Sequence, residues 1–88
     1  MKFTKTAVET ILRKKIAEST FNVHKFEEVQ PGSNLNTDYG MDSIGIINLI
    51  IDLEGEFGIC FEDSDFEDID LSSFNQLVNK IMEKISNE

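Results

Sequence analysis

Residues 43–57 read SIGIINLIIDLEGEF, and their apolar pattern gives the clearest indication of the fold. When it is wound at about 100° per residue, one set of apolar side chains gathers on a single face. The stretch does not alternate as a half-buried strand does, and it is longer than a typical strand, so it predicts an amphipathic helix. Gly58, directly after it, is typical of a helix C-terminus. The residues expected to face the core are Ile46, Leu49, Ile50, Leu53 and Phe57.

A second set of apolar side chains in the same stretch falls on a different face, about 120° away by the same winding. Three isoleucines form it, and polar or acidic residues border it on both sides. Such an arrangement is typical of an apolar interface with a charged rim. The alternative is that a neighbouring helix or the preceding loop covers it. We expect a partner-binding surface formed by Met41, Ile44, Ile47, Ile51, Asp52, Glu54 and Glu56.

Two further amphipathic segments flank this central one. The first is predicted to run from about Thr4 or Thr6 to Ser19, because Thr6 and Glu9 have the spacing of a capping box. The last begins at Ser73, where the same spacing recurs before a clear apolar stripe. Both segments are therefore expected to be long helices that pack against the central one.

The connections between these helices differ in character. From about residue 20 to residue 41 no period persists, which predicts a long loop held by its own apolar anchors. An acid-rich segment, residues 62–70, fits one short helical turn with Phe66 and Ile69 facing the core. The sequence thus predicts an all-α four-helix bundle: three long helices, one short helix and a long loop between the first and second helices. The expected loop anchors are Val29, Leu35 and Tyr39.

The length of the chain limits the number of domains, and its charge limits the classes of partner that it can bind. The chain has 88 residues, which suits one domain spanning residues 1–88. Its net charge is −9; residues 1–30 hold six basic and four acidic residues, whereas residues 31–88 hold two and thirteen. This acidity disfavours nucleic acid as a partner and favours proteins with basic surfaces. The short basic run at residues 13–15 is expected on a solvated helix face.

Cysteine content and hydropathy indicate the compartment. The single cysteine, Cys60, allows no intramolecular disulfide, and its place after an apolar segment predicts a core position. We find no leader before the first helix, and residues 44–61 are too short and too charged to span a bilayer. We therefore expect a monomeric cytoplasmic protein with no membrane contact, and a separate subunit.

Enzyme and metal-site interpretations lack the residues that they need. Ser43 has no glycine two positions before it, and the single histidine, His24, lies in the long loop, where a solvent-exposed role is expected. One cysteine and one histidine cannot build a zinc site. Residues 63–74 begin like a calcium loop, but Asp68 replaces the turn glycine and Phe74 replaces the bidentate glutamate. We expect no catalytic residue and no bound metal.

Ser43 stands at the predicted start of the central helix, directly after the long loop. One interpretation is an N-cap, since serine and aspartate accept the free N–H groups at such a position. The other is an attachment point. The same N–H groups and the positive end of the helix dipole stabilise an anion, so a phosphodiester on Ser43 would suit this position.

Four segments together resemble the acyl carrier protein family: residues 27–29 (EEV), 39–44 (YGMDSI), 53–59 (LEGEFGI) and 71–74 (LSSF). The resemblance covers nearly the whole chain and includes the G-x-D-S-hydrophobic motif. It implies a 4′-phosphopantetheine group attached covalently to Ser43, installed from coenzyme A by a separate Mg²⁺-dependent phosphopantetheinyl transferase. The thiol of this arm would carry an acyl group as a thioester.

The resemblance also implies partners and leaves the cargo open. Asp42 is similar to the family residue that helps to hold the transferase's metal. Acyl-transferring or condensing synthase enzymes would receive the cargo, and the chain itself would catalyse nothing. Gly45 and Asn48 depart from the acidic residues common in housekeeping fatty-acid carriers. Fatty acid, polyketide, aminoacyl or peptidyl, and D-alanyl carriers therefore remain open. The alternative of another class is an acidic helical interaction adaptor with unmodified Ser43.

Overall fold

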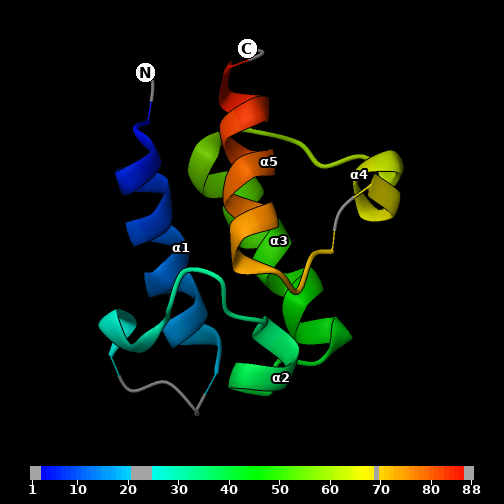
Figure 1. The fold of residues 1–88 in the computed structure, drawn as a ribbon. Coiled ribbons are helices and arrows are strands. Elements are labelled where there is room, and N and C mark those ends of the chain that lie inside the picture. Colours follow the sequence, from blue (N-terminus) through cyan, green and yellow to red (C-terminus); the bar gives the residue numbers. More distant parts are fainter. Residues whose placement is uncertain (1–2, 21–24, 69, 87–88) are drawn as a thin grey trace.

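The computed structural model describes residues 3–20, 25–68 and 70–86 (Figure 1). The elements in chain order are α1 (Lys5–Ser19), the 3₁₀ turn η1 (Phe26–Glu28), α2 (Leu35–Tyr39), α3 (Ser43–Phe57), α4 (Asp63–Asp68) and α5 (Phe74–Ser86). The predicted all-α bundle of three long helices and one short helix is confirmed. The structure adds a second short helix, α2, and a 3₁₀ turn within the predicted long loop.

The helix α1 begins at the first of the two expected positions. Thr4 is its N-cap, and the Thr4 hydroxyl oxygen accepts the N–H of Ala7 at 3.1 Å. The capping box expected at Thr6 and Glu9 is therefore not formed, because Thr6 already lies inside the helix. The buried stripe of α1 packs against both α3 and α5. Its buried residues are Val8, Leu12 and Ile16.

The basic run of α1 is only partly solvated, contrary to expectation. Arg13 is half-buried, and its guanidinium carbon lies 5.9 Å from the centre of the Phe74 ring at the start of α5. A planar cation over an aromatic face is attracted by the negative face of the ring. The sequence could not predict this contact, because it depends on how α5 packs against α1.

The central helix α3 matches its prediction closely. All five residues expected on its core face are buried. Gly58 ends the helix in the left-handed conformation, with φ of 65°, as expected for a C-cap glycine. Because one face of α3 is buried between its neighbours, the rotation of the helix about its axis is fixed.

The long loop is anchored in the core as predicted, since Val29, Leu35 and Tyr39 are all buried. Its backbone is also fastened to the segment before α5. The N–H of Leu35 donates to the carbonyl of Ser72 at 2.6 Å, and the N–H of Phe74 donates to the carbonyl of Ser33 at 3.1 Å. These hydrogen bonds join the loop before α2 to the α4–α5 connection. His24 lies outside the described residues.

The segment after α3 departs from its prediction in two ways. Cys60 is exposed, because side chains alternate in this non-helical segment and the core positions are taken by Ile59 and Phe61. Phe66, expected in the core, is 43% exposed. Phe66 belongs to α4, which stands apart from the three long helices in Figure 1. Ile69 lies outside the described residues. Among the described helices, none is long and apolar enough to cross a membrane.

Replacing Leu53 should distinguish the core face of α3 from its opposite face. Leu53 is fully buried, so Leu53→Ala should lower the free energy of unfolding by about 2–5 kcal/mol. Ile51, two residues earlier on the same helix, is 58% exposed, and Ile51→Ala should change stability by less than about 0.5 kcal/mol. Denaturant unfolding of both variants checks this. Equal losses in the two variants would contradict the assignment of faces.

The stability of the fold should depend on pH through Asp65. Burial by itself would raise the pKa of Asp65, but the N–H of Glu62 and the ammonium groups of Lys84 and Lys80 outweigh it and hold this pKa below 3.8. A depressed pKa gives stability that is fully present above the unfolded-state value and is lost as the pH falls through the folded-state value. NMR titration of the Asp65 carboxyl carbon should give a midpoint below 3.8. The melting temperature of Asp65→Asn should fall less than that of the parent between about pH 6 and about pH 3.

Candidate functional site

Ser43 is the first residue of α3, and its side chain is exposed. The cap of the helix is Asp42, whose Oδ1 accepts the N–H of Gly45 at 2.7 Å. The N-cap interpretation of Ser43 is therefore wrong, because the neighbouring Asp42 is the N-cap of α3. The Ser43 hydroxyl has no hydrogen-bond partner among the described residues. It is consequently available for chemistry.

The lack of a side chain on Gly45 leaves room for this cap. A Cβ at Gly45 would lie 3.2 Å from Asp42 Oδ1, a tighter approach than Cβ atoms usually make. In the sequence, Gly45 departs from the acidic family pattern. In the structure, Gly45 leaves the capping carboxylate of Asp42 uncrowded.

The short helix α2 sets the approach of the chain to Ser43. Gly40 ends α2 in the left-handed conformation, with φ of 71°. The side-chain amide of Asn36 then donates to the carbonyl of Met41 at 2.8 Å. The Met41 side chain turns inward and is only 3% exposed. Met41, predicted to bind a partner, is therefore a core residue, because this turn directs it beneath the start of α3.

The isoleucine face of α3 is exposed: Ile44, Ile47 and Ile51 are 70%, 51% and 58% exposed. The alternative that a neighbouring helix or loop covers these residues is wrong for the described structure. An apolar surface of this kind, rimmed by acids, is typical of a protein-binding site. Its role in binding partners stays a prediction.

The acids expected at the rim of this face are not equivalent. Asp52 and Glu56 are exposed. Glu54 is half-buried, and its Oε2 accepts the N–H of Phe61 at 2.8 Å. The Glu54 carboxylate thus holds the segment that leaves α3. It is less free to steer a partner than the two exposed acids are.

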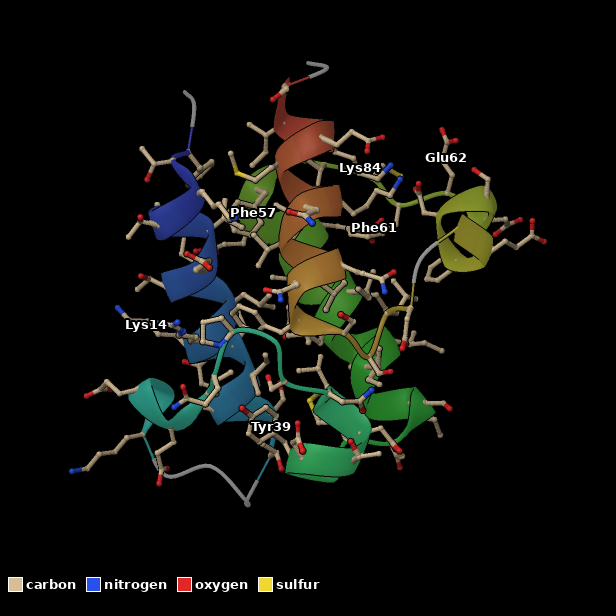
Figure 2. All side chains as sticks on the ribbon, viewed as in Figure 1. Lys14, Tyr39, Phe57, Phe61, Glu62 and Lys84 are labelled. Atoms are coloured by element: carbon tan, nitrogen blue, oxygen red, sulfur yellow. The ribbon has the colours of Figure 1, made fainter. Side chains whose placement is uncertain are left out.

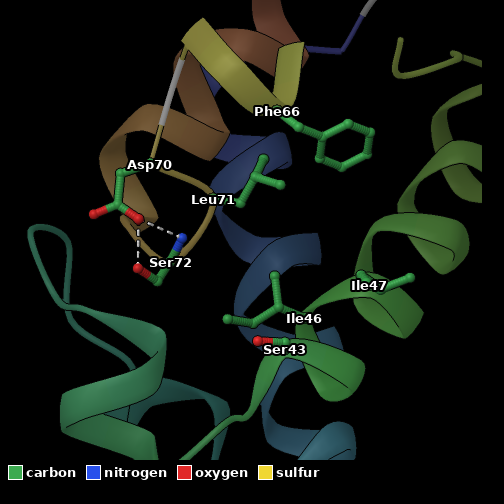
Figure 3. A pocket seen from close by; sticks show the side chains of 7 residues that line it. All are labelled: Ser43, Ile46, Ile47, Phe66, Asp70, Leu71 and Ser72. Atoms are coloured by element: carbon green, nitrogen blue, oxygen red, sulfur yellow. Dashed lines mark hydrogen bonds between the residues drawn. The ribbon is translucent and has the colours of Figure 1, made fainter. Parts of the chain in front are cut away.

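A groove of about 380 Å³ opens beside Ser43 (Figure 3). Three residues of α3 line one side of it, Ser43, Ile46 and Ile47. The other side is formed by Phe66 of α4 and by the α4–α5 connection. Sequence reasoning missed these opposite-side residues as site residues, because no local pattern places them near Ser43. They are Phe66, Asp70, Leu71 and Ser72.

The polar end of the groove is a fixed anionic group. Asp70 Oδ1 accepts both the hydroxyl hydrogen and the N–H of Ser72. The hydrogen bond from the Ser72 hydroxyl, and to a smaller extent the one from its N–H, hold the pKa of Asp70 below its ordinary value. The Asp70 carboxylate is therefore charged at neutral pH. Asn34 donates in turn to Ser72 Oγ at 3.2 Å. The groove therefore has an apolar stretch and one anionic end.

Comparison with known proteins agrees with this geometry. Residues 14–81 match the family model described as a phosphopantetheine attachment site. The chain is 35% identical over 69 residues to an acyl carrier protein of Chlorobium phaeobacteroides, which covers 78% of this chain and 85% of that protein. It is 34% identical over 58 residues to an acyl carrier protein of Thermotoga maritima, covering 66% and 69% of the two chains. It is 33% identical over 63 residues to acyl carrier protein 2 of Pseudomonas aeruginosa, covering 72% and 77%. The chain belongs to the acyl carrier protein family.

The family implies a covalently attached phosphopantetheine group, and the residues around Ser43 fit one. A covalent phosphodiester needs an accessible hydroxyl, and the Ser43 side chain is exposed. Ser43 also lines the groove, so a chain attached to its oxygen can continue directly along the apolar side chains of Ile46 and Ile47. Asp42 is occupied by its capping hydrogen bond through Oδ1 and remains exposed.

Proposed function

We propose that this chain is an acyl carrier protein that bears a phosphopantetheine arm on Ser43 and delivers acyl groups, held as thioesters on the arm's thiol, to partner enzymes. The observation that carries the proposal is the Ser43 hydroxyl at the start of α3, within the family match: it is exposed and has no hydrogen-bond partner among the described residues. The chain acts as a substrate of other enzymes and performs no catalysis. Residues 1–88 would form one carrier domain, and we keep the expectation of a monomeric cytoplasmic protein.

The local electrostatics support attachment at Ser43. The first N–H groups of a helix lack intrahelical partners and carry a partial positive charge. Asp42 takes up the N–H of Gly45, and the N–H groups of Ser43 and Ile44 lie beside the proposed attachment oxygen. A phosphodiester at that oxygen would be stabilised by these donors. The base that removes the hydroxyl proton of Ser43 would come from the transferase.

The surface around Ser43 supports docking by enzymes. The three exposed isoleucines lie on the helix that begins at Ser43, so a partner that binds them also reaches the attachment point. Apolar anchors in an interface supply binding energy, and the charges around them speed encounter with a basic partner. Asp52 and Glu56 are the exposed acids of α3, in a chain of net charge −9. Partners with basic docking surfaces fit this face.

The relatives named above are acyl carrier proteins, and this favours an acyl cargo of fatty acid, polyketide or related biosynthesis. The aminoacyl or peptidyl and D-alanyl alternatives share the same attachment chemistry. They differ in what the thiol carries. Mass spectrometry of the thioester that co-purifies with the native protein distinguishes these cargoes.

Attachment is tested by incubating the chain with coenzyme A and a broad-specificity phosphopantetheinyl transferase. The intact mass of the parent should rise by one phosphopantetheinyl group, and that of Ser43→Ala should not change. Ser64 provides a matched control, because it also follows an aspartate, is exposed and lies in the first turn of a helix. Ser64→Ala should load like the parent. Ser43 is not the N-cap, so Ser43→Ala should change stability by less than about 0.5 kcal/mol.

Two outcomes of this experiment would contradict the proposal. Loading that persists in Ser43→Ala would place the arm elsewhere. A parent whose mass never rises, while a known carrier loads under the same conditions, would favour the unmodified adaptor.

Docking is tested with Ile51→Ala, because Ile51 belongs to the exposed face without lining the groove. Its kcat/KM as a transferase substrate should fall about fivefold or more, with little change in melting temperature, since the contact is buried only in the complex. Glu56→Lys should slow loading mainly at low salt, because exposed charges are screened as ionic strength rises. If Ile51→Ala loads like the parent, the docking face lies elsewhere.

A further inference from the structure

The short helix α4 is attached to the bundle in an unusual way. It stands apart from the three long helices (Figure 1). Glu62, Asp63 and Glu67 in this acid-rich segment are exposed, whereas Asp65 is only 6% exposed. An ionised carboxylate is costly to bury unless charged partners and hydrogen bonds compensate it. The partners of Asp65 therefore decide where α4 lies.

Two lysines of α5 hold this carboxylate. Lys84 Nζ lies 2.7 Å from Asp65 Oδ2, and Lys80 Nζ lies 3.5 Å from Oδ1. The two lysine side chains are only 17% and 11% exposed, respectively. The same carboxylate accepts the N–H of Glu62 at 2.7 Å. Both oxygens of Asp65 are thus committed to contacts that join α4 to α5.

The lysines are scarce, which makes their placement informative. Residues 31–88 contain only two basic residues against thirteen acids, and both form ion pairs with Asp65. Lys80 Nζ also lies 3.5 Å from Oε1 of the exposed Glu83. Lys84 Nζ also lies 5.4 Å from the centre of the Phe61 ring, on the side of α5 that faces Phe61 and Glu62 (Figure 2). A surface role for these cations would leave them exposed and dispersed along α5. Instead they converge on one buried carboxylate.

The position of α4 bears directly on the groove beside Ser43. Phe66, the residue after Asp65, is part of the groove wall opposite α3 (Figure 3). Its ring lies 6.5 Å, centre to centre, from that of Phe61. Since Asp65 and Phe66 are adjacent on a single short helix, the contact that fixes Asp65 on α5 also fixes Phe66 at the groove.

We infer that Asp65 is a positioning residue: its ion pairs with Lys80 and Lys84 hold α4 where Phe66 forms a wall of the groove beside Ser43. Release of these ion pairs would free α4 and open that side of the groove. The main core, built by α1, α3 and α5, would remain in place. The identification of the arm on Ser43 as the occupant of the groove depends on the proposed function. The inferred role of Asp65 in placing α4 does not depend on that function.

The test compares Asp65→Asn with Asp63→Asn in the apo protein by NMR. Asp63 is an exposed acid of the same helix, so its replacement removes the same charge without touching the ion pairs. In Asp65→Asn, NOEs between the Phe61 and Phe66 rings should be lost. Backbone order parameters of α4 should fall from about 0.85 to below about 0.6, while those of the three long helices stay near about 0.85. Asp63→Asn should resemble the parent.

Two further variants separate ion pairing from packing. Asp65→Glu keeps the carboxylate on a longer side chain and should restore part of the lost order, which a purely steric role would not allow. Lys84→Met removes the shorter ion pair while keeping the length of the side chain, and should loosen α4 as Asp65→Asn does. Unchanged NOEs and order parameters in Asp65→Asn would overturn the inference. If Asp65→Asn does not fold, unchanged NOEs and order parameters in Lys84→Met would overturn the inference.

The loaded protein extends the test to the groove. In the parent and in Asp63→Asn, NOEs are expected between the Phe66 ring and the geminal methyl groups of the arm, and Asp65→Asn should lose them. Their absence in a loaded parent would show that the arm does not rest in this groove. A chain that accepts no arm would refute the proposed function, while the apo comparison would still decide the role of Asp65.

Discussion

The burial of one face of α3 is the constraint on which the rest of the structure depends. Five apolar residues of this helix enter the core, so its rotation about its axis is fixed. A second apolar face, offset from the first, must then point outward. The same rotation carries Ser43, at the start of the helix, to the surface. Core packing, the exposed isoleucine face and the candidate attachment point are thus consequences of one helix orientation.

The start of α3 divides two tasks between adjacent residues. Asp42 satisfies the N–H of Gly45, and Gly45 has no side chain that would crowd the carboxylate. Ser43 is thereby relieved of capping, and its hydroxyl remains available. A serine that capped its own helix would have its oxygen engaged with a backbone N–H group and less open to modification. The aspartate therefore allows the helix to keep its cap whether or not Ser43 is modified.

The acids that form ion pairs inside the molecule differ from the acids that are exposed to approaching partners. Asp65 is buried and is paired with the two lysines of α5. Asp52 and Glu56 are exposed on the helix that carries the isoleucine face. Buried pairs are screened little by salt, whereas exposed charges act on approaching partners and are screened strongly. A chain with so few cations can in this way stay strongly acidic on its surface while keeping α4 in place.

The three long helices, the glycine C-cap of α3, the loop anchors and the two apolar faces of α3 could all be predicted from the sequence. These features follow from apolar periodicity and capping preferences, which act over a few residues along the chain. Tertiary packing, in contrast, buries Met41, exposes Cys60 and Phe66, and places Arg13 over Phe74. The groove is likewise a tertiary feature, because its two sides come from segments at least nineteen residues apart in the sequence. Such features depend on which distant segments meet, and a local pattern carries no information about that.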